Sequence, residues 1–325
     1  MRRLSGFAAG AAFAFLPLTA FAQDLTPDST RYLSDPNFLP YTGHIYGYSA
    51  YGHTWTNGDT FNNLSDKTSS FRVNTDTLSQ FLSYGITDDL EVNGAVRYDP
   101  DSQREIDYGN GTRATLNSSG FTDPSFGVVW RALDEGPSPV DFDLFGSYTP
   151  NLINSNSSTI NADGTVARGG ASGTAGAALG YVTQQFSIRG AFNANIFGAS
   201  SSFDPGNGDT YQTQGFNDYV VSLATQTRLD PLFCINAGID HTFASNTNAL
   251  NAANGIVHTT QPGDNTALHA ALNYNLVPEQ AVIAATYTHN FYDNSQSVFA
   301  NPALDTSTRS KSGNVLGMQL SYLLP

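Results

Sequence analysis

The sequence predicts an all-β fold, a 12-stranded antiparallel transmembrane β-barrel with short periplasmic turns and long extracellular loops. Apolar and polar side chains alternate along several segments, which is the two-residue period of strands with one apolar and one polar face. Most expected strands are longer than the about 5–6 residues of a globular strand and can span a bilayer with the about 9–11 that a tilted strand needs. The connections alternate strictly between long and short, as in outer-membrane barrels.

Residues 1–22 have the pattern of a secretory signal peptide. Arg2 and Arg3 precede an apolar run from Gly6 to Leu18, and Ala20-Phe21-Ala22 forms a small-residue cleavage site. The apolar run is too short for a permanent helical span, which needs about 20 residues. We therefore expect an exported chain, cleaved before Gln23 and inserted in the bacterial outer membrane.

Residues 23–42 are predicted to form an irregular N-terminal segment, followed by the β-barrel at 43–325. Pro27, Pro36 and Pro40 oppose a strand here, because proline has no N–H to donate to a ladder. Two placements are open for this segment: it enters the lumen as a plug, or it stays in the periplasm.

The alternation is clear at 90–98, 186–196 and 316–324; Phe186, Ile188 and Phe192, for example, share one face. The segment 71–84 is less regular. Phe71 and Val73 indicate one face while Leu78 and Leu82 indicate the other, so we expect a β-bulge near 76–79. The twelve expected strands are 44–56, 71–84, 89–99, 121–132, 140–149, 171–182, 186–197, 217–229, 232–244, 265–276, 280–292 and 313–324.

The connections set the orientation of the expected barrel. The long ones, rich in Asn, Ser, Gly and Asp, are 57–70, 100–120, 150–170, 198–216, 245–264 and 293–312. Short turns alternate with them, so twelve strands return both termini to the periplasm. Aromatic residues are expected to form two belts at the membrane interfaces. The periplasmic belt would hold Tyr84, Trp130, Tyr181, Tyr274 and Tyr322, and the outer belt Tyr98, Tyr148, Tyr219, Phe243 and Phe291.

Composition excludes several classes of protein. The net charge is −14, from 14 basic and 28 acidic residues, and no basic patch is present, so no nucleic acid is expected as a partner. Cys234 is the single cysteine, which excludes an internal disulfide. The histidines lack metal-ligand spacing, and the loop around Asp204 and Asp209 lacks the ligands of a calcium loop, so no metal or cofactor is expected.

If the apolar positions face lipid, the opposite parity places charged side chains in the lumen. Inward orientation is expected because Arg or Lys on the lipid face would cost about 2–4 kcal/mol at the midplane. These residues either form a mixed-charge constriction that selects solutes, or form salt bridges that brace a narrow barrel. The lumen-lining candidates are Glu91, Arg97, Asp123, Arg131, Asp141, Asp143, Arg189, Asp218, Arg228, Asp240 and His269.

Three short motifs resemble a known family: the stretch 34–40, the hairpin 84–91 with its Tyr-Gly-Ile-Thr-Asp turn, and 120–127, which leads to Trp130-Arg131. Together they resemble the phenol meta-pathway degradation-like, or transporter, family of bacterial outer-membrane β-barrels. The chain departs from the family's Pro-Thr-Gly pattern at Thr149-Pro150-Asn151. The resemblance implies passage of small, largely hydrophobic or aromatic compounds.

The final expected strand carries a Gly317-x-x-Leu320-x-Tyr322 pattern, similar to the assembly signal of outer-membrane barrels, although the chain ends at Pro325 without the usual aromatic residue. The expected partners are therefore outer-membrane lipid, the barrel assembly machinery through the C-terminal strand, and a small-molecule solute.

The leading functional prediction is an outer-membrane channel or transporter for small, largely hydrophobic or aromatic compounds. The alternative is a structural or surface-interaction barrel with an occluded lumen. An outer-membrane hydrolase is the third hypothesis and would need a serine and a histidine within hydrogen-bond reach. No nucleophile motif accompanies His241, so we expect that the chain is not an enzyme.

Overall fold

The computed structural model describes residues 33–133, 139–160, 162–183, 185–205, 208–251, 257–277, 280–299 and 301–325. The expected signal peptide, and residues 23–32 of the irregular segment, lie outside these described residues. No helix among the described residues is long and apolar enough to cross a membrane.

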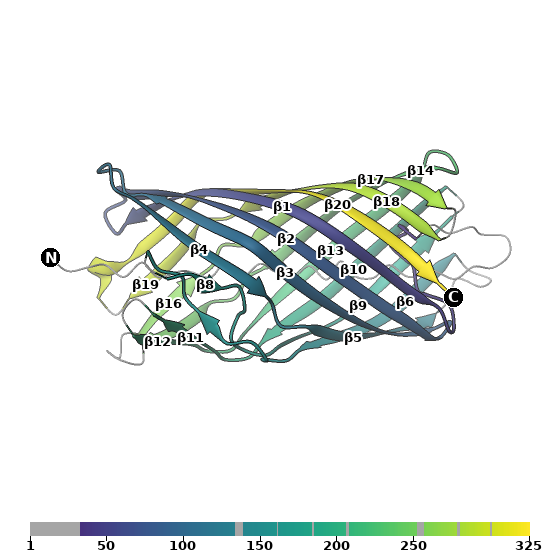
Figure 1. The fold of residues 1–325 in the computed structure, drawn as a ribbon, viewed down its shortest axis with the longest axis horizontal. Helices are drawn as coiled ribbons and strands as arrows, with labels where there is room; N and C mark the ends of the chain where they lie inside the picture. Colours follow the sequence, from purple (N-terminus) through teal and green to yellow (C-terminus); the bar gives the residue numbers. More distant parts are fainter. Residues whose placement is uncertain are drawn as a thin grey trace.

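Twelve strands of the described chain close into an antiparallel barrel, as predicted (Figure 1). The closing pair is β1 with β20, in register from Ile45↔Leu324 to Asn57↔Ser312. Closure leaves no unpaired strand edge in contact with lipid. The barrel strands are β1 (Ile45–Asn62), β2 (Lys67–Thr87), β3 (Leu90–Asp107), β5 (Ser125–Leu133), β6 (Val140–Thr149), β9 (Ser172–Val182), β10 (Phe186–Phe197), β13 (Phe216–Arg228), β14 (Phe233–Phe243), β17 (Asn265–Val277), β18 (Ala281–Tyr292) and β20 (Thr306–Leu324).

The long connections continue the wall of the barrel away from the periplasm, at the end opposite the C-terminus in Figure 1. We call this extension the collar; it comprises the outer ends of β1, β2, β3 and β20 and eight further strands. Successive pairings run from β20 to β19, β16, β15, β12 and β11, and β4 pairs with β3. The further strands are β4 (Arg113–Phe121), β7 (Ser155–Asn156), β8 (Gly164–Thr165), β11 (Ser200–Asp204), β12 (Asp209–Thr213), β15 (Thr247–Asn251), β16 (Val257–Gln261) and β19 (Ser295–Phe299).

The collar shifts several predicted strand boundaries outward. β1, β2, β3 and β20 extend well into 57–70, 100–120 and 293–312, which were expected to be loops. The physical reason is that a strand beyond the bilayer has water available to both faces. It then loses the apolar alternation that marks a strand in sequence, while its backbone ladder continues.

The irregularity expected within 71–84 lies on the neighbouring strand instead. The pairing of β2 with β1 runs unbroken from Ile45↔Tyr84 to Thr60↔Ser69. The register shifts between β2 and β3, where Asp76↔Asp101 is followed by Leu78↔Tyr98, so the extra residue belongs to β3. Phe71 therefore needs no bulge on β2, because it faces the lumen from the collar.

The two faces of the wall differ as predicted for a membrane barrel. The expected belt residues Tyr84, Trp130, Tyr148 and Phe291 are all at least 45% exposed, alongside many exposed aliphatic side chains. The opposite parity carries buried polar and charged side chains. Because the exposed apolar surface requires lipid, the belt places this barrel in a membrane.

Candidate functional site: the lumen and its N-terminal segment

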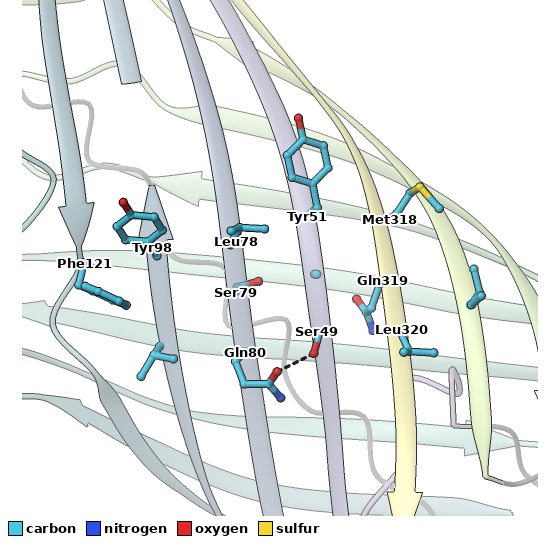
Figure 2. A pocket seen from close by; sticks show the side chains of 13 residues that line it. Ser49, Tyr51, Leu78, Ser79, Gln80, Tyr98, Phe121, Met318, Gln319 and Leu320 are labelled. Atoms are coloured by element: carbon cyan, nitrogen blue, oxygen red, sulfur yellow. Dashed lines mark hydrogen bonds between the residues drawn. The ribbon is translucent and has the colours of Figure 1, made fainter. Parts of the chain in front are cut away.

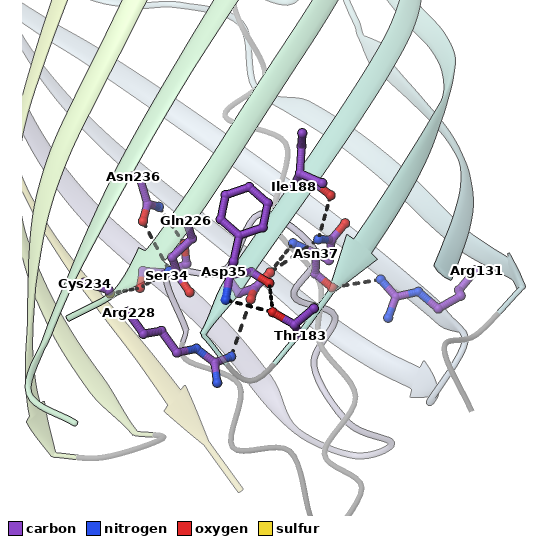
Figure 3. A network of polar contacts seen from close by, with 11 residues as sticks. Ser34, Asp35, Asn37, Arg131, Thr183, Ile188, Gln226, Arg228, Cys234 and Asn236 are labelled. Carbon is purple, nitrogen blue, oxygen red and sulfur yellow. Dashed lines mark hydrogen bonds and ion pairs between the residues drawn. The ribbon is translucent and has the colours of Figure 1, made fainter. Parts of the chain in front are cut away.

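Residues 33–43, here called the inner segment, lie within the periplasmic end of the barrel (Figure 3). The backbone oxygen of Ser34 accepts a hydrogen bond from Asn236 Nδ2 at 2.7 Å, and its hydroxyl accepts one from Gln226 Nε2 at 2.8 Å. The carboxylate of Asp35 lies 3.7 Å from Arg228. Strands β13 and β14 therefore hold the start of the segment.

Apolar side chains of the inner segment pack against the first strands of the wall. Leu33 and Phe38 are 1% and 2% exposed and join a cluster with Tyr46, Tyr48 and Phe81. The rings of Phe38 and Tyr46 have centroids 4.8 Å apart. Burying such side chains contributes about 1.5–3 kcal/mol each.

The far end of the inner segment is fixed to the β2–β3 turn. Asp88 Oδ1 accepts hydrogen bonds from the backbone N–H of Thr42 at 2.9 Å and from its hydroxyl at 2.7 Å. The backbone N–H of Thr42, followed by its hydroxyl, lowers the pKa of the Asp88 carboxyl, because both stabilise the charged form. Gly43 also donates its N–H to the Gly85 carbonyl at 2.9 Å.

Glycine in the wall makes room for this segment. A Cβ on Gly180 would lie 2.1 Å from Asn37 Oδ1, and a Cβ on Gly85 would lie 2.1 Å from the Tyr41 carbonyl oxygen. The Gly85 contact is with backbone atoms, so this position requires glycine while the segment is in place, whereas a Cβ at Gly180 would displace the end of the Asn37 side chain.

A charged layer next to the inner segment brings together four of the predicted lumen residues. Asp143 Oδ1 accepts from Arg131 Nε at 3.0 Å, and Oδ2 accepts from Arg189 Nη1 at 2.5 Å. Asp141 lies 3.9 Å from Arg131. All four side chains are at most 3% exposed. Arg131 Nη2 also donates to the Asn37 carbonyl at 2.8 Å, so the layer holds the inner segment directly.

The remaining predicted residues occupy separate places on the inner face. Glu91 is 1% exposed and accepts from Asn93 at 3.0 Å, whereas Arg228 faces Asp35. Arg97 donates two hydrogen bonds of 2.6 Å to Asp99 higher in the lumen. Asp123 and Asp218 accept backbone N–H groups of connecting segments, at Leu152, Ile153 and Ser245.

His269 and Asp240 form a pair that bears on the enzyme hypothesis. His269 Nε2 lies 2.5 Å from Asp240 Oδ2, and its Nδ1 lies 2.9 Å from the Thr288 hydroxyl. A hydroxyl, an imidazole and a carboxylate thus stand in line. However, the backbone around Thr288 lies within the β17–β18 and β18–β20 ladders, which engage the N–H groups that an oxyanion hole would use.

The lipid-facing side of the wall has a depression of about 530 Å³ over β20, β1, β2 and β3 (Figure 2). Its rim is apolar, with Leu78 and Met318 among the lining residues. Ser49 donates to Gln80 Oε1 at 2.6 Å, and Gln80 Nε2 donates to the Tyr322 hydroxyl at 2.8 Å. These polar groups satisfy one another, which makes their exposure to hydrocarbon tolerable.

Sequence reasoning missed several polar residues of the lumen. Asp35 and Asn37 belong to the segment whose placement was open, and both are 0% exposed. Arg104 and Lys311 lie in segments expected to be loops. Apolar alternation is lost in these segments, so no sequence signal marks them as strands.

No group of three or more His, Cys, Asp or Glu side chains that could hold a metal ion occurs in the described part of the chain. Cys234 is buried, with its Sγ 3.2 Å from the Ser34 hydroxyl.

Comparisons with known proteins support the fold. No family model and no curated protein matches the chain, so membership of the phenol meta-pathway family remains a prediction. The structure is similar to a COG4313 outer membrane channel from Pseudomonas putida F1, with a TM-score of 0.59 and 13% identity over 93% of this chain and 100% of that one.

Two other solved barrels are more distant. A Pseudomonas aeruginosa FadL homologue has a TM-score of 0.41 and 11% identity, over 86% of this chain and 90% of its own. The outer membrane protease OmpT from Escherichia coli has a TM-score of 0.41 and 11% identity, over 88% and 99%. The similarity to the COG4313 channel shows that the chain has the fold of bacterial outer-membrane β-barrels.

Proposed function

We propose that this protein is a passive outer-membrane channel for small, largely hydrophobic or aromatic compounds, and that the inner segment is its periplasmic gate. The observation that carries the proposal is the pairing of charges in the lumen. Asp143 is shared by two arginines, Arg97 is paired with Asp99, and Asp240 with His269. Below the collar, such a lumen presents little net field to a solute and selects weakly against neutral molecules.

The attachments of the inner segment support a gate. Its polar contacts are hydrogen bonds and a loose ion pair, which water can replace when the segment leaves, so each contributes about 0.5–1.5 kcal/mol net. The wall around it is a closed ladder that does not depend on these contacts. The segment can therefore move without the barrel unfolding.

A disulfide lock tests this proposal. The Ser34 hydroxyl lies 3.2 Å from Cys234 Sγ, so Ser34→Cys would place two thiols within a short side-chain movement of the about 2.05 Å of a disulfide. The oxidised variant is expected to lose solute flux in proteoliposomes, and reduction is expected to restore it. Ser34→Cys with Cys234→Ser is the matched control, which keeps the new thiol but removes its partner.

The lock also separates the channel from the occluded structural barrel. The buried inner segment favours that alternative, because it fills the periplasmic end. If benzyl alcohol does not pass through the reduced wild-type protein, the result supports the structural barrel. A flux that persists through the oxidised lock would show that solutes bypass the inner segment.

We also propose that the Asp240–His269–Thr288 arrangement is a brace without catalytic function. Among the described residues, the backbone N–H groups beside its hydroxyl lie in the ladder and are not available to stabilise an oxyanion. Hydrolysis of p-nitrophenyl esters that disappears in Thr288→Val would contradict this.

A further inference from the structure

Two basic side chains lie close together on the inner face of the collar. Arg104 is on β3 and Lys311 on β20. Arg104 pairs with Val73 on β2, Val73 pairs with Thr56 on β1, and Thr56 pairs with Gly313 on β20. Arg104 is therefore level with a residue only two positions from Lys311. Both side chains are half-buried. The two positive charges therefore face the same part of the lumen, above the bilayer.

Neither side chain has a counter-ion or a hydrogen-bond acceptor among the described residues, and Arg104 Nε is buried without a hydrogen-bond partner. This sets them apart from the other basic residues of the described chain, which all make ion pairs or hydrogen bonds. Those residues are Lys67, Arg72, Arg97, Arg113, Arg131, Arg168, Arg189, Arg228 and Arg309. Withdrawing a cation from water without a partner is unfavourable.

Aromatic rings hold the two cations in place. The guanidinium carbon of Arg104 lies 4.9 Å from the centroid of Phe71, and Lys311 Nζ lies 3.9 Å from the centroid of Tyr292. Such contacts stabilise a cation without neutralising its charge. They leave the hydrogen-bonding edges of both groups available to a ligand.

Apolar side chains lie beside Arg104 on the inner face, together with the hydroxyl groups of Thr75 and Ser102. Leu116 pairs directly with Arg104 across the β3–β4 ladder, and Ile106 and Phe71 are paired on the same inner face. A guanidinium binds a carboxylate through two parallel hydrogen bonds, and an ammonium adds a compact point charge. A ligand that matches both the two cations and the neighbouring apolar side chains has a carboxylate on a small aromatic or aliphatic body.

We propose that Arg104 and Lys311 form a binding site in the collar for small apolar carboxylates, with an aromatic acid as the representative ligand. The proposal rests on the proposed channel and gives it a substrate class, because the site lies on the inner face that a solute passes. The net charge of the chain is −14, so the site is a local positive region in an acidic protein. It would concentrate anions that the outer surface otherwise repels.

Isothermal titration of the full-length folded protein in detergent tests the site, with benzoate as the probe and benzyl alcohol as its uncharged counterpart. Arg104→Gln and Lys311→Met keep side-chain length while removing charge. Each is expected to weaken benzoate binding at least tenfold and to leave benzyl alcohol unaffected. Arg113→Gln and Lys67→Met are matched controls, because these collar cations already have partners, Asp107 and Asp59, and they should bind benzoate like the wild type.

Three results would overturn the proposal. The first is the absence of benzoate binding to folded wild-type protein at millimolar concentration. The second is equal benzoate affinity in the wild type and both charge-removing variants. The third is displacement of benzoate by equimolar inorganic phosphate, which would show that the apolar body contributes nothing.

Flux of benzyl alcohol through wild-type proteoliposomes is measured separately and tests only the channel. Flux without benzoate binding refutes the site and leaves the channel intact. Binding without flux refutes the channel and retains the site as a surface-exposed receptor for carboxylates.

Discussion

Replacing Asp143 by Asn is the most informative single change in the charged layer. Asn keeps the size of the side chain but removes the charge that two buried arginines share, through contacts of 3.0 Å to Arg131 and 2.5 Å to Arg189. Asp141, at 3.9 Å from Arg131, remains as a more distant acid. The change therefore leaves buried positive charge that is only partly compensated.

Breaking a buried ion pair by removing one partner costs about 3–5 kcal/mol. Asp141 remains near Arg131 and compensates part of the charge, so we expect the lower part of this range, about 3 kcal/mol, for Asp143→Asn. The measurement is reversible urea unfolding in phospholipid vesicles, followed by the slower gel migration of the unfolded barrel. Asp107→Asn is the control, because its ion pair with Arg113 is solvent-exposed and such pairs contribute little to stability.

The double variant Asp143→Asn with Arg189→Met completes the cycle. Removing one arginine together with the acid takes away most of the uncompensated charge, so the double variant is expected to be more stable than Asp143→Asn alone. An Asp143→Asn protein within 1 kcal/mol of the wild type would refute the reasoning, since it would mean that water solvates the layer as well as the carboxylate does.

Three further predictions concern the inner segment. Gly85→Ala should displace the segment, because the new Cβ would lie 2.1 Å from the Tyr41 carbonyl oxygen, and should raise the open probability in planar bilayers; Gly190→Ala, with open space around it, should change nothing. The same displacement should expose Cys234, now 0% exposed, so maleimide labelling should be at least tenfold faster in Gly85→Ala than in the wild type. Hydrogen bonds from Thr42 lower the pKa of Asp88, so this tether is present above the ordinary carboxyl pKa of about 3.9 and is lost as pH falls through the lowered value. Since Asp88 is largely solvent-exposed, losing its hydrogen bonds with Thr42 costs less than about 1 kcal/mol. The open probability should therefore rise by no more than about fivefold at pH 3 in the wild type. In Asp88→Asn it should stay constant with pH.

The fold was predictable because lipid imposes a strict rule on every second residue. The segment 186–196 alternates cleanly, and its observed strand, β10, has the bounds expected for it. The rule ends where the bilayer ends. The collar strands are rich in Ser, Thr, Asn and Gly on both faces, so the sequence predicted loops there while hydrogen bonds to neighbouring strands extend the ladder.

The lumen was predictable by parity but its contacts were not. Inward positions such as Arg131 and Asp143 follow from alternation within their own strands. Their contact within the charged layer depends on the register of β5 against β6, and the sequence of a single strand does not determine that register. Arg104 shows a different limit. The extra residue of β3 near Asp99 reverses the parity of everything beyond it, so counting outward from Glu91 would have placed Arg104 on the wrong face.

The inner segment combines two kinds of contact, and their energies differ in a way that suits a gate. Polar contacts at Ser34 and Asn37 are exchanged for water on release, so they fix position more than affinity. Release exposes the apolar side chains of Leu33, Phe38 and Leu39, at a cost of about 1.5–3 kcal/mol each. These three side chains therefore supply most of the free energy that keeps the segment in place. A solute that occupies their apolar contacts from the lumen side would remove the larger contribution first. The compounds best able to release the segment are therefore hydrophobic ones.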